Sequence, residues 1–319
     1  MVIGICPTVD FAFKLLFGSP EHTRITIHFL NAILGAAIRI TAITIRNPFL
    51  GKETEEDKLS ILDIVATDEH GRIINIEIQT TVPAGMHQRL CYYVSSLYSR
   101  QLTEGAKYSS LNAAISICVL TKPMYPDDSR LHLDFRLREA SGLLLTDDLQ
   151  VHLLQLSNLT ATVQNVFEAT PIEKWACFLL NADKMTLDDV RRLFHEVEFS
   201  EAAGVLDMIS KNPEQLQQYE ARLKFQRDEA ARLEGAISEG IRQGRAEGRQ
   251  EGLQEGIEKG IEKGIEKGIE KGTLIGRITL LQELLGILEP TVQELTSLDE
   301  AQLSEMAEEL KRRLRTRGV

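Results

Sequence analysis

The chain has 319 residues, of which 43% are hydrophobic, so it can form one domain of catalytic size with additional segments. Its formal net charge of −11 argues against a protein that coats nucleic acid through bulk positive charge. Most of the acidity lies after residue 160, because residues 1–160 carry 14 Lys and Arg against 17 Asp and Glu. A local, metal-assisted nucleic-acid site in the first half is therefore compatible with the charge.

The first half alternates helices and strands. Helices are predicted over residues 9–18 and from Ser19, with Pro20 in its first turn, to Gly35. TAITIR, KLSILDIVAT and RIINIEIQ follow as strands, the last two joined by DEHG. A helix over roughly 85–102 precedes AAISICVLT, an apolar run typical of a buried central strand, and then the strands LHLDFRLRE and LQVHLLQLS. This order predicts an α/β or α+β fold.

From about residue 165 the pattern is helical. It runs through PIEKWACFLLNA, LDDVRRLFHEV and AAGVLDMIS, and then through a long charged segment that starts after the break at Asn212 and Pro213. A last helix is predicted to start at Ser297, where Ser297 and Glu300 form a capping box, and to end in the basic sequence KRRLRTR.

Between these helices, glycine recurs at every fourth position from Gly240 to Gly276, largely in the unit Gly-Ile-Glu-Lys. Each glycine lowers the stability of a helix by about 1 kcal/mol relative to alanine. Within the repeat, residues of like charge also lie four positions apart, where they repel each other on a helix. We expect a solvated tether of partial helicity, or a segment that pairs with a second copy along its Gly/Ile face. The expected divisions are a first domain over 1–164, a helical region with a long charged helix over 165–234, the repeat over 235–276 and a C-terminal helical segment over 277–319.

No targeting segment or cysteine framework is indicated. The first ten residues lack the basic start of a signal peptide, and the longest apolar runs are too short to cross a bilayer. The four cysteines stand far apart without paired spacing, unlike those of zinc sites and disulfide frameworks. We therefore expect a cytoplasmic protein with no membrane partner.

The hairpin LDIVATDEHGRIINIEIQ, residues 62–79, carries the most chemical information. Its second strand alternates three isoleucines on one face with Asn75, Glu77 and Gln79 on the other. On its first strand, Asp63 lies between two apolar side chains on its own face, so we expect its carboxylate to be partly desolvated.

The turn of this hairpin decides whether Asp63 meets Glu77. A two-residue loop would pair Asp68 with Gly71 and leave the two carboxylates on opposite faces. A three-residue loop, with Gly71 in the left-handed conformation, would pair Asp68 with Arg72 instead. Asp63 then faces Glu77, and the glycine favours this register.

The opposed carboxylates of the second register form a candidate metal site. Two carboxylates with β-carbons about 4.5–5.5 Å apart repel each other unless a cation lies between them. An all-oxygen pair with room for water suits Mg²⁺, and Mn²⁺ is also possible. The alternative is a half-exposed hairpin whose polar residues simply face water.

Three segments carry a resemblance to a known family. They are DFAFKLLFG, DKLSILDIVATDEHGRIINIEIQ and MHQRLCYYVSSLYSRQLTEGAKYSSL. Over roughly residues 8–160 the chain resembles the recombination-promoting nuclease/putative transposase (Rpn) family of the PD-(D/E)XK nuclease superfamily. The resemblance implies a restriction-endonuclease-like mixed sheet flanked by helices. It also implies an Mg²⁺-dependent endonuclease that acts on double-stranded DNA and is linked to recombination or transposon-type activity.

The resemblance further implies roles for individual residues. The superfamily aspartate falls on Asp63 and the (D/E) on Glu77, and both would hold the metal together with the Ile78 carbonyl. Gln79 stands at the lysine position, which matches this family's own variant but removes a cation from the reaction centre. Its amide can orient a water molecule, but it cannot act as a charged base.

Two helices carry further candidates. Asp10 and Lys14 are four residues apart and share a helix face, so Asp10 would reach the metal through a water and Lys14 would restore the missing positive charge. A surface ion pair is the alternative. On the helix over 85–102, Arg89 is expected to contact a phosphate. Tyrosines there would stack on a base, or one would pack in the core. The candidate DNA contacts are Gln88, Arg89, Tyr92 and Tyr93.

Functions of three classes fit the sequence. The first is a metal-dependent DNA endonuclease, favoured by the intact Asp63 and Glu77. The second is a catalytically weak or silent DNA-binding or assembly module, favoured by Gln79 and the acidic charge. The third is a self-associating scaffold led by residues 213–317. We expect a homodimer or higher oligomer through the C-terminal helices, whose basic end would contact phosphate or serve only as a helix terminus.

Overall fold

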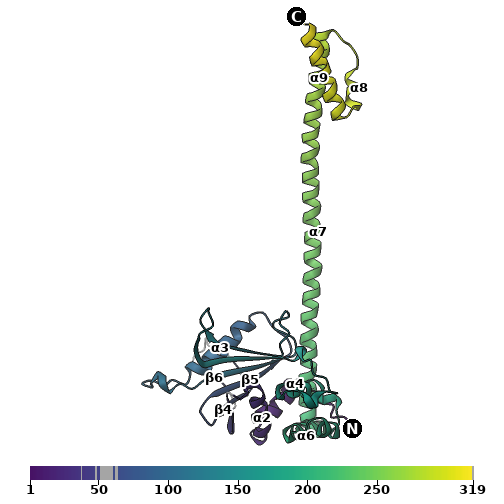
Figure 1. Cartoon of the computed structure of the whole chain (residues 1–319). Coiled ribbons are helices and arrows are strands. Elements are labelled where there is room, and N and C mark those ends of the chain that lie inside the picture. The colour runs from purple at the N-terminus through teal and green to yellow at the C-terminus, as the bar shows by residue number, and fades with distance from the viewer. Residues whose placement is uncertain (37, 47–48, 51–59, 62–63, 318–319) are drawn as a thin grey trace. The chain divides into compact units, whose positions relative to one another are not determined.

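The structure, a computed structural model, describes residues 1–36, 38–46, 49–50, 60–61 and 64–317 (Figure 1). The chain divides into two compact units, Met1–Arg232 and Leu233–Val319. One helix, α7 (Pro213–Leu285), contributes residues to both units.

The first unit alternates helices and strands in the predicted order, with a short strand at Phe49–Leu50 that the sequence did not predict. Besides the start of α7, its α-helices are α1 (Asp10–Gly18), α2 (Thr23–Leu34), α3 (Met86–Ser99), α4 (Pro171–Asn181), α5 (Leu187–Leu193) and α6 (Val197–Lys211). Its strands are β1 (Ile43–Arg46), β2 (Phe49–Leu50), β3 (Ser60–Ile61), β4 (Ile64–Asp68), β5 (Ile73–Gln79), β6 (Ala114–Leu120), β7 (His132–Arg138) and β8 (Leu144–Gln155). Short 3₁₀ helices are η1 (Pro20–His22), η2 (Tyr108–Ser110), η3 (Leu156–Asn158), η4 (Val166–Glu168) and η5 (Ala182–Lys184).

Six of these strands form one mixed sheet, in the order β1-β4-β5-β6-β8-β7. The central pairs β5–β6 and β6–β8 are parallel, and the outer pairs are antiparallel. Every residue of β6 is buried, as its apolar run predicts. The prediction of a mixed sheet with flanking helices is confirmed.

Helices cover both faces of the sheet (Figure 1). Ile74, Ile76 and Ile78 of β5 face the main core. Helices α1, α2, α4 and α6 contribute to this core, and Trp175 is fully buried in it. On the opposite face, α3 packs Tyr93 against Val65 of β4 and Leu90 against Cys118 of β6. Asn75 and Glu77 of β5 therefore lie buried beneath a helix.

A polar cluster lies at the β7–β8 edge of the sheet. His132 Nε2 lies 3.0 Å from His152 Nδ1, and the two rings stack with centroids 5.2 Å apart. His152 Nε2 lies 3.2 Å from Gln150 Oε1, which can only accept, so this nitrogen carries the proton. Burial lowers the pKa of His152 to about 4, against the opposing influence of the Asp134 carboxylate. The ring is therefore neutral at neutral pH.

The N-terminal segment is held by elements that come late in the chain. The amide of Ile3 donates to the Met185 carbonyl at 2.9 Å, and the amide of Cys6 donates to the Tyr219 hydroxyl of α7, also at 2.9 Å. Tyr219 is 4% exposed and belongs to the main core. The first turns of α7 thus complete the first unit.

The second unit is a helical assembly of its own. The end of α7 packs against α8 (Val292–Ser297) and α9 (Glu300–Arg317). Its buried core consists of Ile278, Leu281, Leu285, Leu295, Leu303, Ala307 and Leu310.

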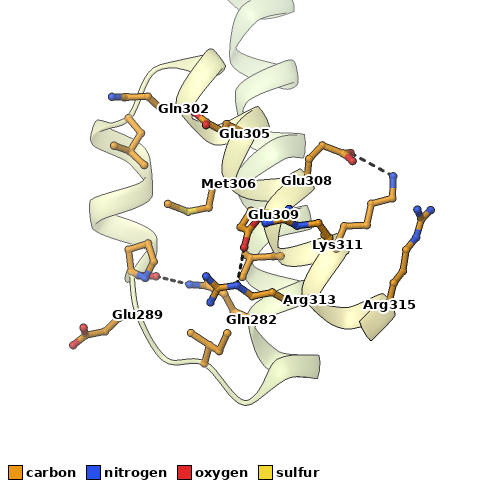
Figure 2. Close-up of a pocket in the computed structure, with 15 residues that line it drawn as sticks. Gln282, Glu289, Gln302, Glu305, Met306, Glu308, Glu309, Lys311, Arg313 and Arg315 are labelled. Carbon is orange, nitrogen blue, oxygen red and sulfur yellow. Dashed lines mark hydrogen bonds and ion pairs between the residues drawn. The ribbon is translucent and has the colours of Figure 1, made fainter. Parts of the chain in front are cut away.

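A groove of about 1060 Å³ lies beside this core, and charged side chains of α9 line it (Figure 2). Gln282 Nε2 donates to the Pro290 carbonyl at 3.0 Å. The basic end of α9 is engaged by acids of the same helix, because Lys311 pairs with Glu308 at 3.3 Å and Arg313 pairs with Glu309 at 3.0 Å. Whether that end contacts phosphate or serves only as a helix terminus stays a prediction.

The glycine repeat differs from the expected partial helix, because α7 is continuous through it. Its isoleucines bury little within the chain, since Ile257, Ile261 and Ile265 are 53–58% exposed. The difference has a physical reason. Both ends of α7 are packed in cores, around Tyr219 and around Ile278, so the repeat need not bear the cost of helix nucleation.

Two predicted helix starts are wrong. Ser19 caps the 3₁₀ helix η1 by accepting from the amide of Glu21, and α2 begins only at Thr23. Ser297 ends α8 and donates to the Glu294 carbonyl, so it forms no capping box with Glu300. Among the residues that the structure describes, no helix is long and apolar enough to cross a membrane.

Candidate active site

The turn between β4 and β5 sets the register of the hairpin. The amide of Asp68 donates to the Arg72 carbonyl and the amide of Gly71 to the Asp68 carbonyl, each at 3.1 Å. Gly71 has φ +80°, and a β-carbon there would come within 2.9 Å of Asn112 Nδ2. The three-residue loop that pairs Asp68 with Arg72 is therefore confirmed.

The side chain of Asp68 holds this turn in place. Its carboxylate accepts hydrogen bonds from the amides of His70 at 3.0 Å and Arg72 at 2.9 Å, and the Arg72 side chain donates to it as well. This sequestered carboxylate explains why the turn keeps a single register.

The same register continues along the strands. Ile64 lies opposite Ile76 and Val65 lies opposite Asn75. One further step along an antiparallel ladder of this register would set position 63 opposite Glu77. Asp63 lies outside the described residues, so its position opposite Glu77 stays a prediction.

Glu77 is buried rather than half-exposed. It is 1% exposed on β5, beside Cys118 of β6 and on the face that α3 covers. The interpretation of the hairpin as an ordinary wet surface is wrong, because the sequence of a strand does not reveal that a later helix covers it. A carboxylate buried in this way needs a compensating cation or hydrogen bonds.

Arg89 of α3 supplies a positive charge near Glu77. Its Nη2 atom lies 3.8 Å from Glu77 Oε2, and its guanidinium carbon lies 5.2 Å from the centre of the Tyr93 ring. The proposed phosphate contact of Arg89 stays a prediction, and its side chain is 37% exposed.

The other candidates on α3 divide between core and surface. Tyr93 is buried, which confirms that one tyrosine packs in the core, whereas Tyr92 is 49% exposed. Gln88 is exposed as well. Tyr92 and Gln88 are therefore accessible to solvent, as is part of the Arg89 side chain, and their proposed contacts with DNA stay predictions.

On α1, Lys14 Nζ lies 2.9 Å from Asp10 Oδ1, and both side chains are about one-third exposed. The pair at i,i+4 is therefore formed. The proposed roles of Asp10 and Lys14 at a metal stay predictions.

A cleft of about 260 Å³ opens at the end of β5. It brings together three residues that the sequence singled out, Asp10, Ile78 and Gln79, with Thr8, Thr80 and Thr81 beside them. Its other wall is the start of α7, through Arg222, Phe225, Gln226 and Glu229.

The α7 wall was not predicted as part of the site. Its four residues follow the spacing i, i+3, i+4, i+7, which marks one helix face. That spacing could have identified the face as a contact surface. It could not have identified the partner, because the N-terminal segment lies more than 200 residues away in sequence.

One comparison with known proteins decides the family. A family model described as PD-(D/E)XK nuclease family transposase matches residues 7–236, more than half of the chain. The chain belongs to this family. The match confirms the resemblance drawn from the sequence and extends it to the first six turns of α7. Neither a curated protein nor a solved structure matches the chain.

PD-(D/E)XK nucleases typically use divalent metals. In this member of the family, no group of three or more His, Cys, Asp or Glu side chains is arranged to hold a metal among the described residues, which leave out Asp63. The expected ligands are nevertheless of the right kind. The carboxylates of Asp63 and Glu77 and the carbonyl of Ile78 are hard oxygen donors, which Mg²⁺ and Mn²⁺ prefer.

Proposed function

We propose that the chain is a metal-dependent endonuclease that hydrolyses phosphodiester bonds of double-stranded DNA, in a process linked to recombination or transposition. The observation that supports this most is the register of the β4–β5 hairpin. It directs the polar residues of β5 to one face, with Glu77 buried and Gln79 at the mouth of a cleft that Asp10 also lines.

Each residue has a defined task in this proposal. Glu77 and Asp63, with the Ile78 carbonyl, would hold the cation. When bound, the metal ion lowers the pKa of a water and neutralises charge on the phosphate under attack. Gln79 orients a water by hydrogen bonding. Asp10 accepts a hydrogen bond from a water in the cleft, and its ion pair with Lys14 holds it in place.

A second function is supported by a separate observation. Gln79 carries no charge at the position of the superfamily lysine, and Arg89 already lies beside Glu77. Both features fit a catalytically weak or silent module that binds DNA and assembles through its C-terminal helices. The exposed isoleucines of the repeat offer a face for pairing with a second copy.

One experiment separates the two functions. Supercoiled plasmid is incubated with the full chain in Mg²⁺, Mn²⁺, Ca²⁺ or EDTA, and DNA binding is measured in Ca²⁺. The endonuclease proposal expects cutting in Mg²⁺ or Mn²⁺ and none in EDTA. Binding without cutting in any metal would support the silent module instead.

A further inference from the structure

The α7 wall of the cleft is held firmly against the N-terminal segment. Tyr219, three residues before Arg222, accepts the Cys6 amide at 2.9 Å, and Gln226 Nε2 donates to the Thr8 carbonyl at 3.5 Å. Leu216 and Leu223 pack against the main core. Arg222 thus projects from a part of α7 that is anchored on both sides of it.

The acidic residues around the cleft are paired with cations other than Arg222, so Arg222 is available to bind an anion. Asp10 pairs with Lys14 at 2.9 Å, and Glu229 pairs with Arg232 at 3.1 Å. Within the part of the chain that the structure describes, Arg222 takes part in no ion pair, and it is the sole Lys or Arg among the cleft-lining residues. Its guanidinium is exposed and can accept an anionic group.

An aromatic surface accompanies this cation. Phe225 also lines the cleft and is 62% exposed, so its ring is not used in the core. An exposed aromatic ring beside an arginine is a combination that suits nucleic acid, because the arginine binds phosphate and the ring stacks on a base or sugar.

We propose that Arg222 binds a phosphate of the DNA strand in the cleft and supplies the positive charge that Gln79 lacks, while Phe225 packs against the adjoining nucleotide. This proposal rests on the proposed nuclease function. It assigns a part of the site to α7, outside the sheet, α1 and α3 that carry the other candidate residues.

The test compares Arg222→Gln with Arg222→Lys and with Lys224→Gln in the full chain. Lys224 is an exposed cation on α7 that does not line the cleft, so its variant controls for loss of one charge. Binding of a duplex oligonucleotide is measured in Ca²⁺ over a range of salt. Arg222→Gln is expected to weaken binding about tenfold and to reduce the salt slope by about one. Arg222→Lys should keep most of the affinity, and Lys224→Gln should change it less than twofold.

A compensation experiment tests the link to Gln79. The single-turnover rate of cleavage in Mg²⁺ should be at least tenfold lower in Arg222→Gln than in the wild type. In the double variant Arg222→Gln/Gln79→Lys, most of the lost rate should be restored. The cleavage rate of Gln79→Lys alone is measured beside them, so that any effect of the new lysine itself is separated from the compensation. Circular dichroism should be the same for all variants, since both positions are at least partly exposed.

The outcomes separate the two proposals. If the wild type cuts DNA and Arg222→Gln binds and cuts equally well, the assignment of Arg222 is wrong while the nuclease function stands. If Lys224→Gln loses as much DNA affinity as Arg222→Gln, the effect comes from the loss of any positive charge on α7, and the assignment of Arg222 is also wrong. If the wild type binds but never cuts, the nuclease function fails, and the binding measurement still decides on Arg222. If it neither binds nor cuts, both proposals fail.

Discussion

The Nη2 atom of Arg89 lies 3.8 Å from Oε2 of Glu77, so the buried carboxylate of the candidate metal site faces a guanidinium from α3. Glu77 is enclosed, whereas the Arg89 side chain is 37% exposed and has room to turn toward solvent. A divalent cation bound at Glu77 would compete with this guanidinium for the same carboxylate. Metal binding at Glu77 would therefore be coupled to the position of Arg89.

This coupling predicts that Arg89→Gln binds metal more tightly than the wild type. Removing the competing cation should raise the affinity for Mn²⁺ by about tenfold, or ~1.4 kcal/mol. Isothermal titration calorimetry on the full chain measures it. Arg100→Gln, which removes an exposed cation at the end of the same helix, is the matched control and should leave the affinity unchanged. Weaker metal binding in Arg89→Gln would contradict the competition.

Glu77→Gln should abolish metal-dependent cleavage without unfolding the chain. Glutamine keeps the shape of the buried side chain but removes the charge that a metal needs. The loss of cleavage activity should exceed roughly 10–100-fold, which is the usual effect of removing a residue that hydrogen-bonds to a metal ligand. We expect the same of Asp63→Asn. Plasmid cleavage and thermal unfolding measure the two effects.

The control for this pair is Glu104→Gln, on an exposed loop, which should cut at the wild-type rate. Wild-type cleavage by either site variant would place the chemistry elsewhere in the molecule.

His152 should make the folded state less stable as pH falls from about 6.5 to about 4. Burial lowers the pKa of the folded ring to about 4, while the unfolded ring keeps its usual value near 6.5. Below pH 6.5 the unfolded chain therefore binds a proton that the folded chain does not. The loss approaches on the order of 3 kcal/mol at the acid end of this range.

Urea unfolding at pH 7 and pH 4.5 measures this effect, and His152→Gln should reduce the difference in unfolding free energy between the two values. The exposed His70→Gln serves as the control and should keep the wild-type difference. An unchanged difference in His152→Gln would show that other groups cause the pH dependence.

Removing residues 235–319 should leave cleavage in place and alter assembly. The first compact unit ends at Arg232, and the family match ends at residue 236, so this cut keeps both the cleft and Tyr219. Light scattering after size exclusion gives the oligomeric state, and the ratio of nicked to linear plasmid gives the number of strands cut. A monomer that only nicks is the expected result. A dimer that linearises DNA as well as the full chain would rule out the C-terminal unit as the dimerising element.

A cut after residue 212 is a different experiment. It removes Tyr219, whose hydroxyl accepts the Cys6 amide, and all four residues of the α7 wall. We expect this shorter chain to be less stable as well as inactive, so it cannot test assembly alone.

Local patterns predicted the hairpin well. The alternation of β5 and the glycine at position 71 were enough to obtain the register, because both act between residues close in sequence. The apolar run of β6 likewise predicted its central place in the sheet. These features depend on side-chain period and turn geometry, which a sequence displays directly.

Features that depend on distant contacts were missed. Nothing in the strand sequence shows that α3 covers Glu77, or that Arg89 comes within 3.8 Å of it. The α7 wall depends on contacts such as that of Cys6 with Tyr219, across 213 positions. The helicity of the glycine repeat depends on packing at both ends of α7, which local propensity does not contain.

The contact between the first residues of the chain and α7 has a consequence for synthesis. A ribosome adds about 5–20 residues per second, so β4, β5 and α1 emerge well before Tyr219 and Arg222 do. During that interval the amide of Cys6 lacks its partner and the cleft lacks one wall. A nascent chain therefore carries Glu77 and Gln79 without the arginine that we assign to phosphate binding. If Arg222 binds phosphate as proposed, the order of translation itself delays the moment at which the binding site is complete.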